Sequence, residues 1–565
     1  MKIAVEGCCH GQLDDIYGSI RLLEHKEGIK IDLVLICGDF QAIRNVADLE
    51  CMAVPPKYRQ LGTFHKYYSG SKVVPYPTVF IGGNHEASNY LWELYYGGWA
   101  AQNLYFLGWG GVINFAGVRI AGSSGIFKGN HYRCGHYEKA PYSSSDLRSI
   151  YHVRQYDIRK LGLLRNPIDI MLTHDWPRGI EQFGDVQKLL RVKKYFRQEV
   201  ARNELGSPAN EELLSKLHPK FWFSAHLHVK FAAIVNHDDW MRRNDRQARA
   251  GAGNLQTQPI ANPDEIVIAF DDDEMETPAP NTDEITVDRN EIVDAEPSSK
   301  QVQSTGNPNE IVTGDDLDDV DVNADDIVHP NDGVIDINQE ISKEVPTASM
   351  TDVSQTITTP HDELMNETTE KTPMLDPAET KTTRFLSLDK CLPGRQFLQV
   401  LDVATSEETF TFQYDVEWLA ITQVTNKYLS LEYGQPALPS DEDLYSEVAE
   451  KMQELQQKVA NGTIDLNIPH NFVPTAPAHD DSKQLTRQDI STYIYPFSNP
   501  QTETFCQKLE IENKFKASNT GMAPPIASAA VETVASEEAP PGDATPPKRP
   551  RLDLPSPKVD SDIVH

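Results

Sequence analysis

The chain has 565 residues and a net charge of −32, but this charge is unevenly distributed. Residues 1–250 hold 32 Lys and Arg against 25 Asp and Glu, whereas the remaining residues hold 20 against 59. Twelve of the 17 histidines also fall in the first 250 residues. A basic, His-rich region suits a polyanionic substrate and an acidic region does not, so we expect the chemistry to lie in residues 1–250.

Cysteine usage and hydropathy indicate the kind of cellular compartment in which the protein works. The seven cysteines are scattered, with no Cys-x-x-Cys pair, which favours a reducing compartment over a disulfide framework. The chain opens directly into an apolar run at residues 2–6 without the pattern of a secretory leader. No apolar run approaches the roughly 18–20 residues that span a membrane. We therefore expect a soluble intracellular protein with no membrane partner.

Strand-like and helix-like patterns alternate over the first 230 residues. After the run at residues 2–6, apolar residues recur at helical spacing over residues 12–26. Strands that alternate with helices and pass into polar loops at their carboxyl ends predict an α/β or α+β sandwich, with functional loops along one edge. Further strands are predicted at residues 31–36, 78–81, 104–107, 112–122, 168–173 and 221–225.

The composition changes over residues 251–382, which are rich in Asp, Glu, Asn, Thr and Pro and almost free of aromatic residues. Such a segment buries too little apolar surface to offset the entropy of ordering, so we predict a disordered acidic insert. Glu-Ile-Val fragments recur loosely within it, and we interpret them as low-complexity drift rather than docking motifs.

An ordered pattern resumes at residues 383–514, which we expect to form a C-terminal accessory domain. Residues 515–565 are predicted to be a disordered Pro-rich tail. The tail contains a basic cluster at residues 547–551 that resembles a nuclear localisation signal, although a chance basic patch is the alternative. Strands are predicted at residues 384–388 and 397–401 and helices at residues 414–431 and 441–459, and residues 501–509 are expected to be ordered.

Four fragments at predicted strand ends carry metal-binding residue types. A lone His after a strand is usually a packing or surface residue, but His226 and His228 at an i, i+2 spacing face the same side of a strand. The order, the placement and the donor types together indicate two metal ions that share the Asp39 carboxylate around a phosphate. The fragments are Cys8-x-His10, Gly38-Asp39, Gly82-Gly83-Asn84-His85-Glu86, and His174 with His226-x-His228.

This order resembles the calcineurin-like metallophosphoesterases, which implies two sheets packed as a sandwich, flanked by helices, with the metal site at the strand ends. The closer resemblance is to the RNA lariat debranching enzymes, in which Cys8-Cys9-His10 replaces the usual Asp-x-His. The resemblance implies a catalytic domain at 1–250, a lariat recognition loop at 124–154, the insert at 251–382 and the family's own C-terminal domain at 383–514. Residues 122–132, 173–177 and 223–231 carry the same resemblance.

The resemblance also implies a role for each site residue. His85 is not a metal ligand but faces the scissile phosphate, where it donates a proton to the leaving oxygen or stabilises the charge that develops there. The Cys8 thiolate shifts the preference from magnesium toward zinc or iron, with manganese as a further candidate, and one or two metals are expected per chain. The implied metal ligands are Cys8, His10, Asp39, Asn84, His174, His226 and His228.

The sequence differs from the superfamily pattern at two further residues. Ala225 replaces the usual Gly before His-x-His, which we expect to leave ligation intact. Ile43 stands where the Ser/Thr phosphatase branch has Arg, and Arg44 follows one residue later, which counts against that branch.

Basic and aromatic residues interleave in the 124–154 loop, as is common in proteins that bind nucleic acid. A solvated loop rich in Tyr and Arg is the alternative interpretation. For residues 191–197, a second basic run, a solvated helix face is the preferred interpretation. The candidate RNA-binding residues of the loop are Lys128, His131, Tyr132, Arg133 and Tyr142.

These inferences converge on hydrolysis of the 2′,5′-phosphodiester bond at the branch point of excised intron lariats. The alternatives are another metallophosphoesterase activity, such as a 3′,5′ nuclease or a nucleotide phosphatase, and a non-enzymatic RNA-binding scaffold. We expect a nuclear protein, with the cytoplasm as an additional location, whose partners are branched RNA and splicing-related proteins that bind the insert or the tail.

Overall fold

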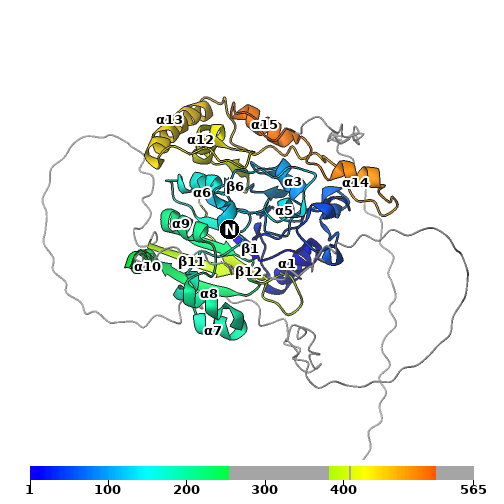
Figure 1. The fold of residues 1–565 in the computed structure, drawn as a ribbon. Coiled ribbons are helices and arrows are strands. Elements are labelled where there is room, and N and C mark those ends of the chain that lie inside the picture. Colours follow the sequence, from blue (N-terminus) through cyan, green and yellow to red (C-terminus); the bar gives the residue numbers. More distant parts are fainter. Residues whose placement is uncertain (254–380, 406, 408, 517–565) are drawn as a thin grey trace, which may run out of the picture. The chain divides into compact units, whose positions relative to one another are not determined.

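The computed structural model describes residues 1–253, 381–405, 407 and 409–516 (Figure 1). The predicted acidic insert lies almost entirely outside these residues, as does the Pro-rich tail with its basic cluster at 547–551. Within the described ranges, the helices are too short or too polar to cross a membrane.

A six-stranded sheet contains the first strands of the chain. Its order is β12-β1-β2-β3-β5-β4. The pairs from β1 to β5 are parallel, and the two edge strands, β12 and β4, run antiparallel to their neighbours. The strands are β1 (Lys2–Glu6), β2 (Leu33–Ile36), β3 (Thr78–Phe80), β4 (Gly98–Ala101), β5 (Leu104–Phe106) and β12 (Leu398–Asp402).

A seven-stranded sheet holds the remaining strands in the order β10-β11-β9-β8-β7-β6-β13. The central pairs from β11 to β7 are parallel, and the outer pairs are antiparallel. The strands are β6 (Gly110–Phe115), β7 (Val118–Ser123), β8 (Ile170–Thr173), β9 (Phe221–Ser224), β10 (Phe231–Asn236), β11 (Thr382–Ser387) and β13 (Phe412–Tyr414).

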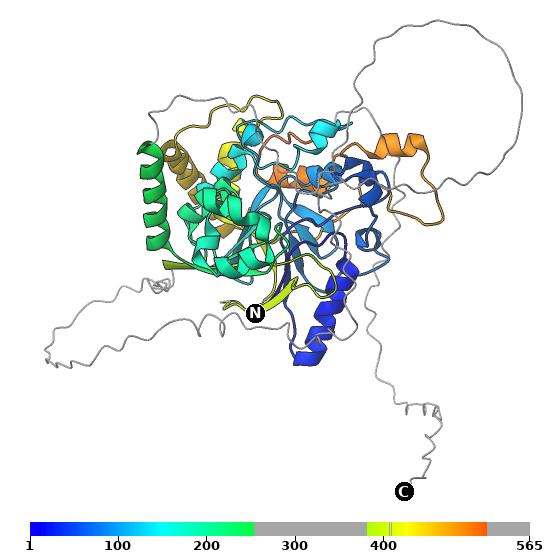
Figure 2. The same ribbon diagram turned by 60° about the horizontal axis from the view of Figure 1, so that its bottom comes forward.

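Helices flank the sheets. The predicted helix at residues 12–26 is α1 (Leu13–Glu27), which ends at Gly28 in the left-handed conformation that glycine tolerates. In both views α12 and α13 lie side by side (Figure 1 and Figure 2). The other helices are α2 (Phe64–Tyr68), α3 (Ser88–Glu93), α4 (Gly129–Tyr132), α5 (Ser144–Leu147), α6 (Gln155–Gly162), α7 (Val186–Val192), α8 (Arg197–Arg202), α9 (Pro208–Leu217), α10 (His237–Gly253), α12 (Val416–Thr425), α13 (Asp441–Ala460), α14 (Arg487–Tyr493) and α15 (Pro500–Lys508), with short 3₁₀ helices η1 (Asp48–Cys51), η2 (Pro56–Tyr58), η3 (Ile180–Phe183), η4 (Lys194–Phe196) and η7 (Asn426–Tyr428).

The core lies between the two sheets and on their outer faces. Ile3 and Val5 of β1 pack in one apolar cluster with Ile120 and Ile170 of the other sheet, whereas Ala4 belongs to the cluster outside the first sheet. Strands buried on both faces fit the continuous apolar runs seen in the sequence. The expected two-sheet sandwich flanked by helices is therefore confirmed.

The region after residue 381 completes both sheets. Strand β11 lies between β10 and β9, with the pairing Phe385↔Ala233 on one side and Phe385↔Trp222 on the other. Strand β12 pairs with β1, and β13 pairs with β6. The sequence predicted the strands β11 and β12 but not their places in the sheets.

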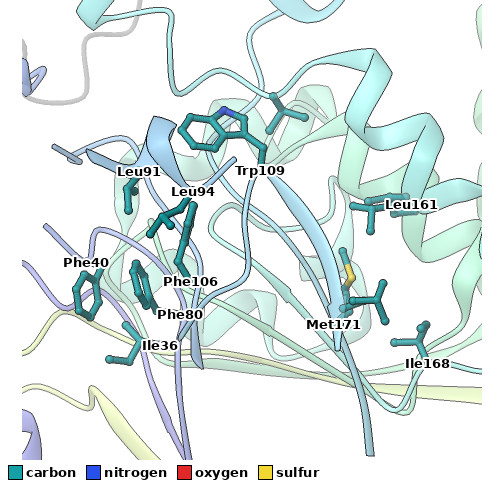
Figure 3. Packing of buried hydrophobic residues seen from close by; sticks show 14 of the residues in the cluster. Ile36, Phe40, Phe80, Leu91, Leu94, Phe106, Trp109, Leu161, Ile168 and Met171 are labelled. Atoms are coloured by element: carbon teal, nitrogen blue, oxygen red, sulfur yellow. The ribbon is translucent and has the colours of Figure 1, made fainter. Parts of the chain in front are cut away.

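Aromatic rings support the loops at the end of the first sheet. The rings of Phe40 and Phe80 stack with centroids 3.8 Å apart, and those of Phe80 and Phe106 are 5.1 Å apart. Figure 3 shows these three side chains beside Ile36. Because Phe40 directly follows Asp39, and Phe80 lies two residues before Gly82, this packing fixes both loops.

Candidate metal centre

The carboxyl ends of neighbouring strands deliver the predicted site residues to one place. β1, β2 and β3 are consecutive parallel neighbours in one sheet, and β8 and β9 are parallel neighbours in the other. Parallel strands present their carboxyl ends at the same edge of a sheet, so the loops that follow them meet. The structure brings together all seven predicted ligands and His85.

One group of donors lies within bonding reach of a single ion. Nε2 of His10 is 3.3 Å from Nε2 of His228 and 3.7 Å from Oδ2 of Asp39. Sulfur, imidazole and carboxylate together suit zinc or iron better than magnesium. The donor atoms of Cys8, His10, Asp39 and His228 all lie within 4.8 Å of one another.

A second group shares Asp39 with the first. Nε2 of His174 is 3.3 Å from Oδ1 of Asp39 and 3.2 Å from Oδ1 of Asn84. The ring of His226 lies 5.0 Å from the ring of His174, centroid to centroid. The two carboxylate oxygens of Asp39 thus face different groups, which is the geometry of a bridging ligand. The residues present therefore fit two metal ions.

Backbone groups orient the donors. Nδ1 of His174 donates to the carbonyl oxygen of Cys37 at 2.8 Å, which leaves Nε2 as the nitrogen that faces Asp39. The backbone N–H of His226 donates to Sγ of Cys8 at 3.2 Å.

Burial and neighbouring charges fix the protonation states. Burial lowers the pKa of His10 to about 4, of His226 to about 3 and of His228 to about 2, so these rings are neutral near pH 7. Neutral imidazole is the form that binds metals. Burial alone would raise the pKa of Asp39, but the imidazole of His174, followed by that of His85, holds it well below its usual range.

The ligand loops have unusual backbone conformations. Four of the seven predicted ligands have left-handed φ angles: His10 at 44°, Asp39 at 45°, His226 at 61° and His228 at 46°. Side chains other than Gly, Asn and Asp rarely adopt this region, and each such residue costs on the order of 1–3 kcal/mol. These conformations lower the stability of the fold, so contacts with the surrounding residues must maintain them, and their cost is consistent with a role in the site.

Glu86, to which no role was assigned from the sequence, connects two loops of the site. Its buried carboxylate accepts backbone N–H groups of Phe40, Gln41 and Gly83 at 2.7, 2.8 and 2.9 Å. It therefore joins the loop after β2 to the loop after β3. The local signal was weak, a carboxylate three residues after two loop glycines, because its partners at 40 and 41 are remote in sequence.

His85 lies beside the donors rather than among the four that share one ion. Its backbone N–H donates to Oδ1 of Asp39 at 2.9 Å, and its ring lies 5.8 Å from that of His10. Its Nδ1 is buried, without a hydrogen-bond partner in the described part of the chain.

Arg44 is a structural residue. It is fully buried and pairs with Asp48 at 2.9 Å and Glu93 at 2.8 Å, and it donates to Thr475 at 3.1 Å. These contacts tie the loop that follows Asp39 to the C-terminal region. Arg44 is therefore unavailable for phosphate binding.

The 124–154 segment includes α4 and α5 and holds the five RNA-binding candidates. Lys128 and Arg133 are exposed, whereas Tyr132 and Tyr142 are half-buried. Nδ1 of the half-buried His131 is 2.7 Å from Nδ1 of His152.

Two other residues of this segment are not at the surface. His136 and Arg154 are among the basic and aromatic residues that interleave in this segment, but both are buried. His136 is buried against Asp157 at 2.8 Å, and Arg154 is buried against Glu138 at 2.5 Å. Both side chains stabilise the packing of the loop through these buried pairs, because buried ionisable groups require partners.

Together the sandwich, the strand-end loops and the shared aspartate define a calcineurin-like phosphoesterase, and the family model described as calcineurin-like phosphoesterase matches residues 1–230. A second model, described as lariat debranching enzyme, C-terminal domain, matches residues 380–514. The chain belongs to the lariat debranching enzyme family.

Curated relatives support this assignment. The lariat debranching enzyme of Homo sapiens is 38% identical over 517 residues, which cover 90% of this chain and 69% of that protein. The Schizosaccharomyces pombe enzyme is 38% identical over 536 residues, which cover 93% and 98%. The Arabidopsis thaliana enzyme is 59% identical over 237 residues, which cover 42% and 57%. The family resemblance found in the sequence is confirmed.

Proposed function

We propose that this chain hydrolyses the 2′,5′-phosphodiester bond at the branch point of excised intron lariat RNA. The observation that carries the proposal is the pair of donor groups around Asp39 in a chain whose relatives are named lariat debranching enzymes. Branched RNA is the substrate, and linear RNA open to ordinary turnover is the product.

Divalent transition metals complete the site in this proposal. Cys8, His10, Asp39 and His228 would hold one ion, and Asp39, Asn84, His174 and His226 a second. Zinc, iron or manganese bound there would neutralise the phosphate oxygens and lower the pKa of the attacking water. One or two ions per chain are compatible with the shared carboxylate.

His85 serves the leaving group. As the water oxygen bonds to phosphorus, the bond from phosphorus to the 2′ oxygen breaks, and the imidazole of His85 donates a proton to that oxygen. Because Nδ1 of His85 is buried, Nε2 is the nitrogen left for this transfer. The products are a 2′-hydroxyl on the trunk strand and a 5′-phosphate on the released strand.

The 124–154 loop supplies recognition in this proposal. Lys128 and Arg133 are exposed cations for phosphates, and His131 adds a polar ring beside them. Tyr132 and Tyr142 offer only partly accessible rings. The basic cluster at 547–551 supports a nuclear location, where splicing-related partners of the insert or tail would be found.

The test is cleavage of a synthetic branched RNA by protein loaded with zinc, iron or manganese. We expect wild type to open the 2′,5′ bond and His85→Ala to be slower by about 10²-fold or more while it retains its metal. His25→Ala, which removes an exposed imidazole of α1, is the matched control. A metal-loaded wild type that leaves the 2′,5′ bond intact contradicts the proposal, and equal cleavage of linear RNA favours a nuclease.

A further inference from the structure

The C-terminal region adds a loop to the metal centre. This loop connects β11 to β12 and runs beside the residues that follow β1. Cys8 forms a parallel β-bridge with Lys390. The N–H of Cys8 donates to the carbonyl of Asp389 at 3.3 Å, and the N–H of Cys391 donates to the carbonyl of Cys8 at 3.2 Å. These bonds fix the loop in register with the first metal-binding fragment.

The register determines where Lys390 points. Residues paired in a β-bridge project their side chains to the same face, and their neighbours project to the other. Sγ of Cys8 belongs to the first donor group, so Lys390 shares the face on which that group lies. Lys390 is half-buried, so its stem packs while its ammonium group can reach solvent.

Two donors on the face that Lys390 shares border the solvent. Burial is the main reason that the pKa values of His10 and His228 are low, and the charge of Lys390 contributes to both. Both imidazoles are half-buried, whereas Cys8 and Asp39 are fully buried. Lys390 therefore lies near the donors that border the solvent.

Within the described ranges, Lys390 forms no ion pair with a carboxylate. The nearest carboxylate along the chain, that of Asp389, lies 3.6 Å from Arg395 and accepts the backbone N–H of Lys390 at 2.7 Å. Lys193 also contributes its positive charge to the surroundings of Asp389. Arg395, Lys193 and Lys390 thus all contribute positive charge near one buried carboxylate, and of these Arg395 pairs with it.

We propose that Lys390 binds a phosphate of the RNA next to the one that is cleaved. This inference rests on the proposed function, because a branch nucleotide carries phosphodiesters on its 2′, 3′ and 5′ oxygens. When one of them occupies the metal centre, the other two lie within one nucleotide of it. A lysine ammonium is a mobile point charge that suits such a contact. Lys390 is thus a substrate-binding residue supplied by the C-terminal region.

The first test measures binding. Metal-loaded His85→Ala protein, with and without Lys390→Met, is titrated with fluorescent branched RNA at several salt concentrations. We expect Lys390→Met to weaken binding about tenfold and to reduce the slope of log K against log salt by about 0.7–0.9, as for the loss of one phosphate contact. Lys390→Arg should restore most of both. Lys30→Met, which removes an exposed charge before the amino end of β2, is the control.

The second test separates the neighbouring phosphate from the reacting one. Bis(p-nitrophenyl) phosphate is a diester without neighbouring phosphates. We expect the ratio of kcat/KM for branched RNA to that for this diester to fall about tenfold in Lys390→Met, mainly through KM. An equal loss on both substrates, or an unchanged salt slope, overturns the inference.

The two proposals fail separately. If wild type binds branched RNA with the expected dependence on Lys390 but does not open the 2′,5′ bond, the proposed function is wrong and the phosphate contact stands. If wild type opens the bond and Lys390→Met binds with an unchanged salt slope, the function stands and the contact is wrong.

Discussion

At the residue scale, short contacts fix the positions of the side chains around Asp39. Asp39 receives the backbone N–H of His85 at 2.9 Å, and its oxygens lie 3.3 Å from His174 and 3.7 Å from His10. Glu86 fixes the same loops through three backbone N–H groups. Geometry of this kind sets what the donors can bind, because a small displacement removes them from coordination distance.

Gly83→Ala tests how tight this packing is. A Cβ at residue 83 would lie against Oδ1 of Asp39 and 2.7 Å from Nε2 of His174, although the backbone there tolerates alanine. We expect a loss of bound metal, measured by elemental analysis, and at least about a 10²-fold loss of activity. The control is Gly18→Ala in α1, where no atom lies within 4 Å of the added methyl and stability should rise by about 0.5–1 kcal/mol. Gly83→Ala with full metal content contradicts the account.

The backbone conformation of His228 should make glycine more stable than alanine at this residue. Its φ of 46° is costly for alanine but not for glycine. In metal-free protein, His228→Gly should therefore be more stable than His228→Ala by about 1 kcal/mol, measured by urea denaturation. Because both variants lack the imidazole, the difference isolates the backbone. Equal stabilities would mean that this residue is not strained.

At the element scale, local pattern predicted most of the strands but few of the helices, and it did not predict which strands are neighbours. The strand at 168–173 and the helix at 441–459 appear nearly as expected, as β8 (Ile170–Thr173) and α13 (Asp441–Ala460). α3 escaped prediction because all six of its residues are buried, so it shows no amphipathic stripe. The placement of β11 between β9 and β10 depends on contacts across more than 140 residues, which no local period encodes.

The residues of the site were likewise predictable only where their local sequence carried the signal. The ligands were found because their residue types carry the chemistry and their order matches a family. Glu86 and Lys390 were not assigned, because their roles depend on partners that only the fold brings near. The burial of Arg154 could not be predicted, because a sequence does not show that Glu138 pairs with its charge.

Helix α6 buries a lysine, and this gives a pH prediction. Lys160 is 2% exposed, lies 4.7 Å from the ring of Trp418, and burial lowers its pKa to about 8 from 10.5, with the charge of Asp157 opposing the shift. Below pH 8 the folded state bears the cost of a buried charge, up to about 3 kcal/mol. Between pH 8 and 10.5 the unfolded chain still binds the proton, so stability rises with pH.

Lys160→Met should therefore stabilise the protein at pH 7, and its advantage over wild type should shrink between pH 8 and 10. Urea denaturation at pH 7, 8, 9 and 10 measures the difference. Lys30→Met, which changes an exposed lysine, should show no such trend. An advantage that stays constant or grows over this range would contradict the burial of a charge at residue 160.

At the whole-molecule scale, the C-terminal region is part of the catalytic fold. Strand β11 is hydrogen-bonded on both edges, β12 pairs with β1, and the loop between them contacts Cys8. Residues 1–253 alone would lack a strand from the middle of one sheet. We therefore expect the two regions to depend on each other for folding.

A protease site engineered between residues 254 and 380 tests this dependence. After cleavage, the fragments should elute together in gel filtration and retain activity within about twofold, because sheet pairing holds them without the connection. Uncleaved protein with the same insertion is the control. Fragments that separate without denaturant would show that the two regions are independent.

In the proposed function, this centre opens a 2′,5′ bond and leaves the 3′,5′ bond of the same nucleotide intact. Mass spectrometry of the products from one branched RNA in ¹⁸O water tests this specificity. We expect one labelled oxygen on the 5′-phosphate of the released strand, a free 2′-hydroxyl on the trunk and an unbroken trunk. A phosphate left on the 2′ oxygen, or cleavage of the trunk, would contradict it.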